Sequence, residues 1–343
     1  MHAPICRYWT FHPVRFNLEP VNEVLLALLS LVLATNRPAV ASNLIHSIAG
    51  VAVAIPVPAD PAEKEYRALL ELDDKVMTEI DELILRNQAA AGQNAALGPE
   101  QLRQQIEAKL EPVRRAYEDF LRRYPNHARA RLAYGSFLND TRDEAGAVAQ
   151  WEKALELDPS NPAAWNNLAN YYGHRGPVKK AFEYYAKAIE LNPFEPVYYH
   201  NLGTTVYLFR KDAMEFYGIN EQQVFDKALE LYNKALQLDP TNFVLATDIA
   251  QTYYGIRPFR ADAAIKAWEY ALSLAPDETA RQGIHVHLAR VKINAGRFDQ
   301  ARQHLSTVTN QLYDVLKNRL LRKLAEEEAK QPPTNAPVGI KHE

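Results

Sequence analysis

Polar side chains recur at a fixed interval along the middle of this 343-residue chain. Asn167 and Asn201 lie 34 residues apart, and Asp248 takes the corresponding place in a later segment that follows an insertion. A side-chain amide carries a donor and an acceptor together, so a row of such groups can pair with the backbone of an extended peptide whatever its sequence. The spacing therefore indicates peptide binding. The alternative is that these residues merely favour a solvated helix surface.

Residues that could do covalent or metal chemistry form no recognisable set. The motifs GxGxxG, GxxxxGK[ST], GxSxG and HExxH are absent from the sequence. His285 and His287 are two residues apart, which places them on different faces of a helix and disfavours a metal pair. Cys6 is the only cysteine, which excludes intramolecular disulfides and cysteine-rich zinc sites. We expect no enzyme, no metal site and no cofactor. The remaining histidines of this region are isolated in the sequence: His174, His200 and His304.

Composition limits the fold and the partners. The 39 basic and 42 acidic side chains give a net charge of -3, so no overall field draws the chain onto nucleic acid. The 13 Gly are too few for many tight hairpins, and the 21 Pro fall mostly between runs of good helix formers. These counts predict an almost all-helical protein.

Proline marks a repeat of 34 residues. Pro125, Pro159 and Pro193 are spaced 34 apart, and each closes a similar helical phrase such as 154–159. The later members, Pro240 and Pro276, follow at intervals of 47 and 36 residues. We interpret these longer intervals as the same unit carrying insertions of 13 and then 2 residues.

The best copy of the repeat identifies its type. Along 162–195 the pattern residues are Trp165, Leu168, Ala169, Tyr172, Ala181, Tyr185, Ala188 and Pro193. This order resembles the tetratricopeptide repeat. The resemblance implies an all-α, right-handed superhelical solenoid of antiparallel helix pairs. Large side chains of the first helix would pack against small side chains of the second.

The predicted organisation follows from the repeat. We expect an apolar or irregular N-terminal segment over 1–59, a helix and a low-complexity linker over 60–98, a solenoid over 99–315, a capping helix over 316–328 and a disordered tail over 329–343. Within the solenoid we expect six units, of which the first and last are degenerate: 99–127, 128–161, 162–195, 196–242, 243–278 and 282–315. The first helix of unit 99–127 is not evident in the sequence.

The resemblance also implies a concave groove lined by the first helix of each unit. Side chains at set positions of each unit face this groove in the family. The matching residues here are Asn166, Asn167, Asn170, His200, Asn201, Thr204, Asp248, Gln251 and Arg290. The recurrent Asn resemble the asparagine ladder of O-linked N-acetylglucosamine transferases, from which only peptide holding carries over. Asn166, Val244 and Asp248 replace the Lys and Arg of the family's carboxylate clamp, which is therefore disfavoured.

The two insertions form a second candidate site. Both fall between the paired helices of adjacent units, so we expect them to emerge side by side on one edge of the stack. Their aromatic and basic residues could bind a partner or a second copy of the chain, or could simply pack onto the scaffold. Asn220 and Gln223 form a capping box that restarts a helix at about 221. The candidate residues are Arg210, Met214, Phe216, Tyr217, Arg257, Phe259 and Arg260.

The N-terminal region contains an 11-residue apolar run, residues 24–34. The run has the length of a signal-peptide core and is too short to span a bilayer, and 39–41 would serve as a cleavage site. Glu19 and Glu23 precede it, whereas a signal peptide usually has a basic start. The alternative is an N-terminal helix that buries its apolar face on the end of the solenoid or in an oligomer.

Together these features predict a non-enzymatic scaffold or adaptor that binds an extended segment of a protein partner, with self-association also open. One alternative is an exported or membrane-associated assembly factor addressed by residues 24–34. The other is an enzyme whose site lies in the irregular N-terminal hundred residues, although no motif supports it. Localisation is cytoplasmic or, if the run acts as a signal, exported.

Overall fold

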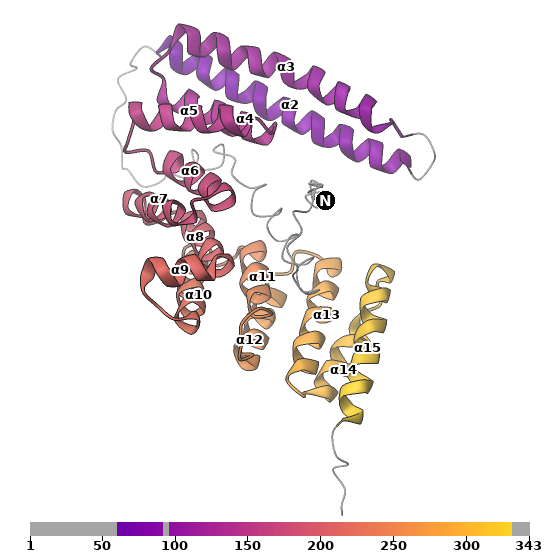
Figure 1. Cartoon of the computed structure of the whole chain (residues 1–343). Helices are drawn as coiled ribbons and strands as arrows, with labels where there is room; N and C mark the ends of the chain where they lie inside the picture. Colours follow the sequence, from indigo (N-terminus) through magenta and orange to yellow (C-terminus); the bar gives the residue numbers. More distant parts are fainter. Residues whose placement is uncertain (1–59, 92–95, 331–343) are drawn as a thin grey trace, which may run out of the picture. The chain divides into compact units, whose positions relative to one another are not determined.

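The computed structural model describes residues 60–91 and 96–330. Every regular element among these residues is helical, as Figure 1 shows. The chain divides into two compact units, Met1–Pro193 and Phe194–Glu343. Helices α2 to α7 belong to unit 1, and α8 to α15 belong to unit 2. The all-α prediction is confirmed. The predictions for residues 1–59 and for the tail beyond 330 lie outside the described residues.

Unit 1 begins with a long helical hairpin. Helix α2 covers Pro61–Ala91 and α3 covers Pro99–Arg123. The hydroxyl of Tyr117 donates to Oδ2 of Asp73 at 2.7 Å, and Lys109 pairs with Glu79 at 2.6 Å. Helix α2 therefore supplies the partner of α3 that the sequence did not reveal. It also extends to Ala91, several residues into the stretch that the sequence indicates as a linker.

Two helix pairs follow in unit 1, and their boundaries match the repeat. The first pair is α4, Ala128–Asp140, with α5, Glu144–Leu157; the second is α6, Pro162–Arg175, with α7, Val178–Leu191. Helices α5 and α7 each end two residues before a repeat proline, whose ring cannot continue a helix. Helix α6 begins with Pro162 at its first position, and the side chain of Asn161 caps it by accepting from the backbone N–H of Ala163.

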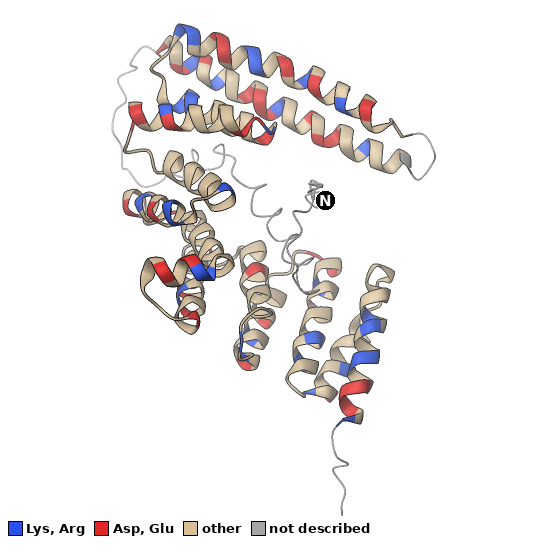
Figure 2. Ribbon diagram, viewed as in Figure 1, with Lys and Arg blue, Asp and Glu red and all other residues tan. Residues whose placement is uncertain are grey.

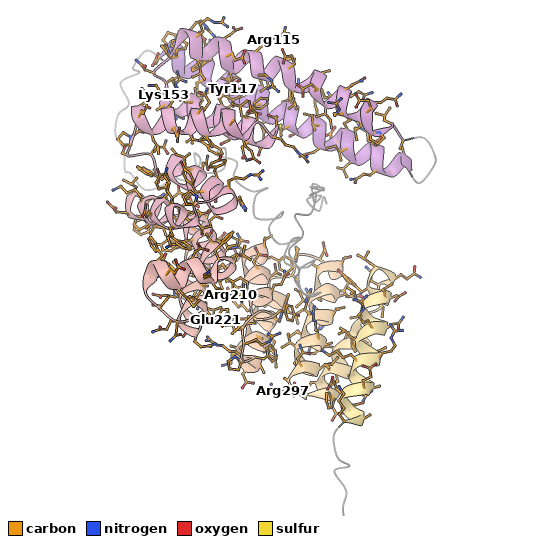
Figure 3. The ribbon with its side chains drawn as sticks, in the orientation of Figure 1. Arg115, Tyr117, Lys153, Arg210, Glu221 and Arg297 are labelled. Atoms are coloured by element: carbon orange, nitrogen blue, oxygen red, sulfur yellow. The ribbon has the colours of Figure 1, made fainter. Side chains whose placement is uncertain are left out.

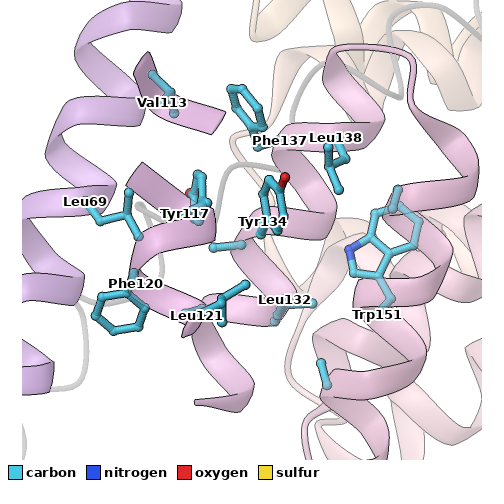
Figure 4. Close-up of a cluster of buried hydrophobic side chains, with 14 of the residues drawn as sticks. Leu69, Val113, Tyr117, Phe120, Leu121, Leu132, Tyr134, Phe137, Leu138 and Trp151 are labelled. Atoms are coloured by element: carbon cyan, nitrogen blue, oxygen red, sulfur yellow. The ribbon is translucent and has the colours of Figure 1, made fainter. Parts of the chain in front are cut away.

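Close packing in each pair depends on small residues on both helices. Ala181 and Ala188 of α7 are fully buried, as the small-residue positions predict. The reverse arrangement also occurs, because a Cβ atom on Gly135 of α4 would lie 2.5 Å from the ring of Trp151 on α5. Figure 4 shows Trp151 in the core of this unit. Trp165 differs from the prediction, because it is only partly buried and its indole N–H donates to the carbonyl of Pro159.

Unit 2 contains three more helix pairs, one inserted helix and a terminal helix. In chain order these elements are α8 Pro196–Leu208, α9 Arg210–Tyr217, α10 Glu221–Leu238, α11 Phe243–Thr252, α12 Ala261–Ser273, α13 Glu278–Asn294, α14 Phe298–Thr307, a 3-10 turn Gln311–Tyr313 and α15 Asp314–Ala329. The pairs are α8 with α10, α11 with α12, and α13 with α14. Helix α15 packs on α13 and α14, as expected of a capping helix.

The insertions modify the repeat without breaking it. Helix α9 is the first insertion, and it ends at Gly218, whose φ of 65° lies in the left-handed region that favours glycine. The predicted capping box of Asn220 and Gln223 is present at the start of α10. In the second insertion, a Cβ atom on Gly255 would lie 1.8 Å from the hydroxyl of Tyr207. Glycine is therefore required there for α8 to approach this loop.

Candidate peptide-binding face

In unit 1 the polar residues of successive first helices contact one another. The side-chain amide of Asn167 on α6 donates to the hydroxyl of Ser136 on α4 at 3.3 Å. Asn167 holds the sixth position of its repeat, and Ser136 holds the ninth position of the preceding one. The contact therefore links neighbouring repeats rather than the two helices of one pair.

The ninth position of a repeat is also reached from its own second helix. The hydroxyl of Tyr185 on α7 donates to Oδ1 of Asn170 at 2.6 Å. In unit 2, the hydroxyl of Tyr232 on α10 donates to that of Thr204 on α8 at 3.1 Å. Where a repeat has Trp at the corresponding place, no such bond forms: the buried indole N–H groups of Trp151 and Trp268 have no acceptor.

A charged pair takes the corresponding place in unit 2. Nε2 of His200 on α8 lies 3.2 Å from Oδ2 of Asp248 on α11. The two atoms are within ion-pair distance, yet the angles of a hydrogen bond are not met, and neither carboxylate oxygen of Asp248 has a hydrogen-bond partner. A buried carboxylate without a donor is unfavourable. Asp248 is therefore an acceptor that the chain itself leaves unsatisfied.

A third contact of this kind joins α11 and α13. Nδ1 of His287 lies 3.0 Å from the hydroxyl of Tyr254, and its ring stacks on Trp268 with the centroids 4.2 Å apart. The guanidinium of Arg290 lies over the ring of Tyr254, 4.4 Å from its centroid. Burial lowers the pKa of His287 to about 4, and the nearby charge of Arg290 contributes. His287 is therefore neutral at pH 7.

The predicted groove residues are more buried than a solvated surface would allow. The exposed fractions of the sixth-position residues Asn167, Asn201 and Asp248 are 9%, 4% and 6%, and that of Asn166 is 2%. The alternative that these residues favour a solvated helix surface is therefore wrong. The remaining predicted residues are partly buried: Asn170, His200, Thr204, Gln251 and Arg290.

We call the first-helix side chains of unit 2 the unit-2 face: His200, Thr204, Asp248, Gln251, His287 and Arg290. The unit-1 face consists of Ser136, Asn166, Asn167 and Asn170. On both faces the sixth-position residue of one repeat contacts the first helix of the preceding repeat, as Asn167, Asp248 and His287 do. Each face is therefore a row of polar groups that extends from one repeat to the next.

The residues of the two insertions mainly contact their own scaffold. Arg210 pairs with Glu221 at 3.6 Å, as the labelled side chains in Figure 3 show. The ammonium group of Lys227 lies 4.4 Å from the ring centroid of Tyr217, and Phe259 packs on the core around Trp268. Met214 and Phe216 are partly buried, whereas Arg257 is exposed. These contacts match the scaffold-packing alternative.

The start of α10 brings the two insertions together, as the sequence predicts. Arg260 pairs with Asp226 at 2.6 Å and donates to the side-chain oxygen of Gln222 at 3.2 Å. The side-chain amide of Gln222 in turn donates to the carbonyl of Arg257. The second insertion is thus fastened to the helix that directly follows the first.

A histidine pair lies between α13 and α14, although His304 looks isolated in the sequence. Nδ1 of His304 lies 2.9 Å from Nδ1 of His285, and its Nε2 lies 3.0 Å from Nζ of the buried Lys292. Burial, with help from Lys292, lowers the pKa of His304 to about 4. His285 and His287 face different neighbours, as predicted. No group of three or more metal-ligating side chains occurs within residues 60–91 and 96–330.

Sequence reasoning missed Ser136, and it assigned Tyr185 and Tyr232 only a packing role. The two tyrosines occupy the same repeat position, and each hydroxyl reaches a ninth-position residue. The recurrence of Tyr at one position, with a polar residue always at the ninth, was the available signal. Ser136 offered none, because its role depends on contact with the next repeat.

The repeated helix pairs and the recurrent polar positions define a helical-repeat protein. Models of the tetratricopeptide repeat match this sequence at residues 114–154, 145–176, 162–195 and 258–326. The chain is therefore a tetratricopeptide repeat protein, and proteins built from this repeat are interaction scaffolds.

One curated relative aligns with part of the chain. The peroxisomal targeting signal receptor of Candida albicans is 28% identical over 180 residues. The alignment covers 50% of this chain and 28% of that receptor, so the chain matches less than a third of its relative's length.

Several solved structures share the repeat architecture. The pilF protein of Pseudomonas aeruginosa has a TM-score of 0.46 and 17% identity, and the match covers 75% of this chain and all of that one. YrrB, described as a tetratricopeptide repeat protein with an unusual peptide-binding site, has a TM-score of 0.45 and 16% identity, covering 60% of this chain and 98% of its own. A structure of MamA has a TM-score of 0.40 and 24% identity, covering 50% of this chain and 92% of that one.

No helix among the described residues is both long and apolar enough to cross a membrane. The apolar run 24–34 lies outside those residues.

Proposed function

We propose that this chain is a non-enzymatic scaffold that holds an extended segment of a protein partner on the first-helix faces of its repeats. One observation carries the proposal. In three repeats the sixth-position side chain contacts the first helix of the preceding repeat, at 3.3 Å for Asn167, 3.2 Å for Asp248 and 3.0 Å for His287. A row of polar groups with this spacing matches the backbone groups of an extended peptide.

The state of these groups supports binding over a purely structural role. Amide and hydroxyl groups of this kind can exchange their contacts for bonds to a peptide at little net cost, because one hydrogen bond replaces another. The oxygens of Asp248 have no donor from the chain itself, so a peptide N–H that reaches them gains a bond without breaking one. The curated relative is named as a receptor for a targeting signal, which fits recognition of a protein segment.

The test is affinity capture from the native lysate with the full chain, followed by titration of tiled peptides from the captured protein. The variant is Asn167→Ala combined with Asn201→Ala. The matched control is Asn233→Ala, because Asn233 is an exposed asparagine on the second helix α10. Helical signal and melting temperature are checked first for each variant.

We expect the double variant to lose at least tenfold in peptide affinity and the control to bind as the wild type does. If the double variant folds and binds the same peptide with wild-type affinity, the first-helix faces are not the site. The insertion edge around Phe216 and Phe259 would then be examined.

A further inference from the structure

The end of unit 2 carries a cluster of exposed apolar side chains. The described residues contain six exposed large hydrophobic side chains, and three of them lie within five residues: Leu312, Val315 and Leu316, with exposed fractions of 70%, 72% and 44%. Single exposed apolar residues are ordinary, but a cluster marks a surface that contacts something.

Helix periodicity explains which side of α15 is left open. Leu320 and Leu324 point into the core formed with α13 and α14, and their exposed fractions are 7% and 1%. Residues three or four apart share a face, so Leu316, Arg319 and Arg322 lie on a side of the helix away from that core. We call this surface the terminal face: Leu312, Val315, Leu316, Arg319 and Arg322.

The two arginines of the terminal face have no counter-charge. Both are exposed, and neither has a hydrogen-bond or ion-pair partner among the described residues. The other charged side chains of α15 behave differently. Lys317 and Lys323 donate to the carbonyl of Val308 and to Asn294, and Glu328 pairs with Arg302. Figure 2 shows the basic residues of α15 followed by its acidic end.

A segment of the same chain has the complementary order of residues. Glu19 and Glu23 precede the apolar run 24–34, so acidic residues come first and apolar residues follow. In a helix, one face of this segment would contain Glu19, Glu23, Leu26, Leu29 and Leu33, which are spaced three and four residues apart. Pro20 suits the first turn of such a helix, where its missing N–H costs nothing.

We propose that residues 19–33 dock as a helix, antiparallel to α15, on the terminal face of the same chain. With Glu23 opposite Arg319, Leu26 lies opposite Leu316, because both pairs are separated by three residues along their helices. The same register places Leu29 and Ser30 near Leu312, and Glu19 near Arg322. A single alignment thus satisfies the apolar residues and both arginines.

The chain is long enough for this contact. The stretch between Ala34 and Asp60 can extend about 85 Å at about 3.3 Å per residue. Two other occupants fit less well. An anionic bilayer lying along α15 would meet the repulsive carboxylates Glu326 to Glu328. A second copy of α15 paired antiparallel about Leu316 would set Arg319 against the uncharged Tyr313.

Disulfide trapping in the full chain tests the contact. In a Cys6→Ser background, Leu26→Cys is combined with Leu316→Cys. The matched control combines Leu26→Cys with Leu85→Cys, because Leu85 is an exposed leucine of α2 in unit 1. We expect an intrachain disulfide with position 316 and none with position 85. A disulfide-linked dimer through position 316, or equal trapping at both positions, overturns the proposal.

Charge reversal gives a second measurement that does not depend on trapping. Hydrogen exchange of residues 312–319 is followed in Glu23→Arg, in Arg319→Glu and in the variant carrying both. We expect each single variant to exchange at least tenfold faster than wild type, and the double variant to regain protection. Lys234→Glu, at an exposed lysine of α10, is the control and should leave the rate unchanged. Unaltered exchange in both single variants overturns the proposal.

Two further results would also overturn it. One is a purified chain whose N-terminal sequence begins beyond Leu33, because the docking segment would then have been removed. The other is cosedimentation with phosphatidylserine vesicles that Arg319→Glu abolishes, because the terminal face would then bind lipid. Retention of Glu23 and no effect of Arg319→Glu on vesicle binding are expected.

Discussion

The two units place different chemistry on the same repeat positions. In unit 1 the contact between successive first helices joins neutral groups, the amide of Asn167 and the hydroxyl of Ser136. In unit 2 the contacts involve ionisable groups, His200 with Asp248 and Tyr254 with His287. The repeat scaffold therefore fixes where polar side chains meet but not what they are. Unit 2 should respond to pH and to charge more strongly than unit 1.

The largest expected effects separate the two units. Trp268 of unit 2 and Trp151 of unit 1 occupy the same repeat position and are both buried. Each change to Ala should cost about 3 to 5 kcal/mol in the free energy of unfolding, because a large core side chain is lost. Contacts in repeat proteins are mostly local, so native-state hydrogen exchange should lose protection mainly in the mutated unit. Equal loss in both units for each variant would show that they unfold as one.

Acid should weaken unit 2 more than unit 1. The pKa of His287 is about 4 in the folded chain and about 6.5 when unfolded, so the unfolded chain binds more protons between these values. Stability present above pH 6.5 is lost as the pH falls toward 4, by about 3 kcal/mol for His287. In unit 1, burial also lowers the pKa values of His127 and His174.

Urea unfolding at several pH values, read by hydrogen exchange in each unit, checks this difference. His287→Gln should reduce the acid loss of unit 2 and leave unit 1 as it was. An acid loss in unit 2 that His287→Gln does not change would mean that another group, such as His304, is responsible.

The insertion edge distinguishes unit 2 in a third way, because unit 1 has no corresponding insertion. Phe259 packs beside Trp268, so Phe259→Ser should lower stability by about 2 kcal/mol. Phe216→Ser should cost less, because Phe216 lies on the short inserted helix α9. Sedimentation velocity should be unchanged in both. Lost association with an unchanged melting curve would instead identify a self-association surface.

The smallest predicted effects have opposite signs in the two units. Asn167→Ala should destabilise unit 1 by about 1 kcal/mol, because Ser136 loses a buried hydrogen bond. Asp248→Asn should stabilise unit 2 by about 1 kcal/mol, because it removes a buried charge that has no hydrogen-bond donor. Thermal unfolding measures both. A loss of stability in Asp248→Asn would show that the ion pair with His200 is net favourable.

Much of the fold is predictable from the sequence because it depends on local signals. The prolines locate the helix ends, and Asn220 with Gln223 locates the restart after α9. Helix α2 was not recognised as the partner of α3, because their hairpin has an apolar stripe but none of the phrases that mark the repeat. Packing between long helices follows hydrophobic periodicity, which does not name a partner.

The candidate faces were predictable as positions but not as contacts. Family spacing placed Asn167 and Asp248 on first helices, yet it did not reveal their partners Ser136 and His200. These contacts join separate repeats, so they depend on how one helix pair is stacked on the next. The proximity of His285 and His304 was missed for a related reason, because the two residues come from different helices of one pair.

The hairpin of α2 and α3 has a consequence for dynamics. At about 1.5 Å per residue, the 31 residues of α2 span about 45 Å, whereas the 13 or 14 residues of a repeat helix span about 20 Å. Near Tyr66 and Tyr117 a third helix, α4, covers the hairpin, but toward Asn87 the two helices have only each other. Opening should therefore begin at the Asn87 end, where a protease would make its first cut, and progress toward α4.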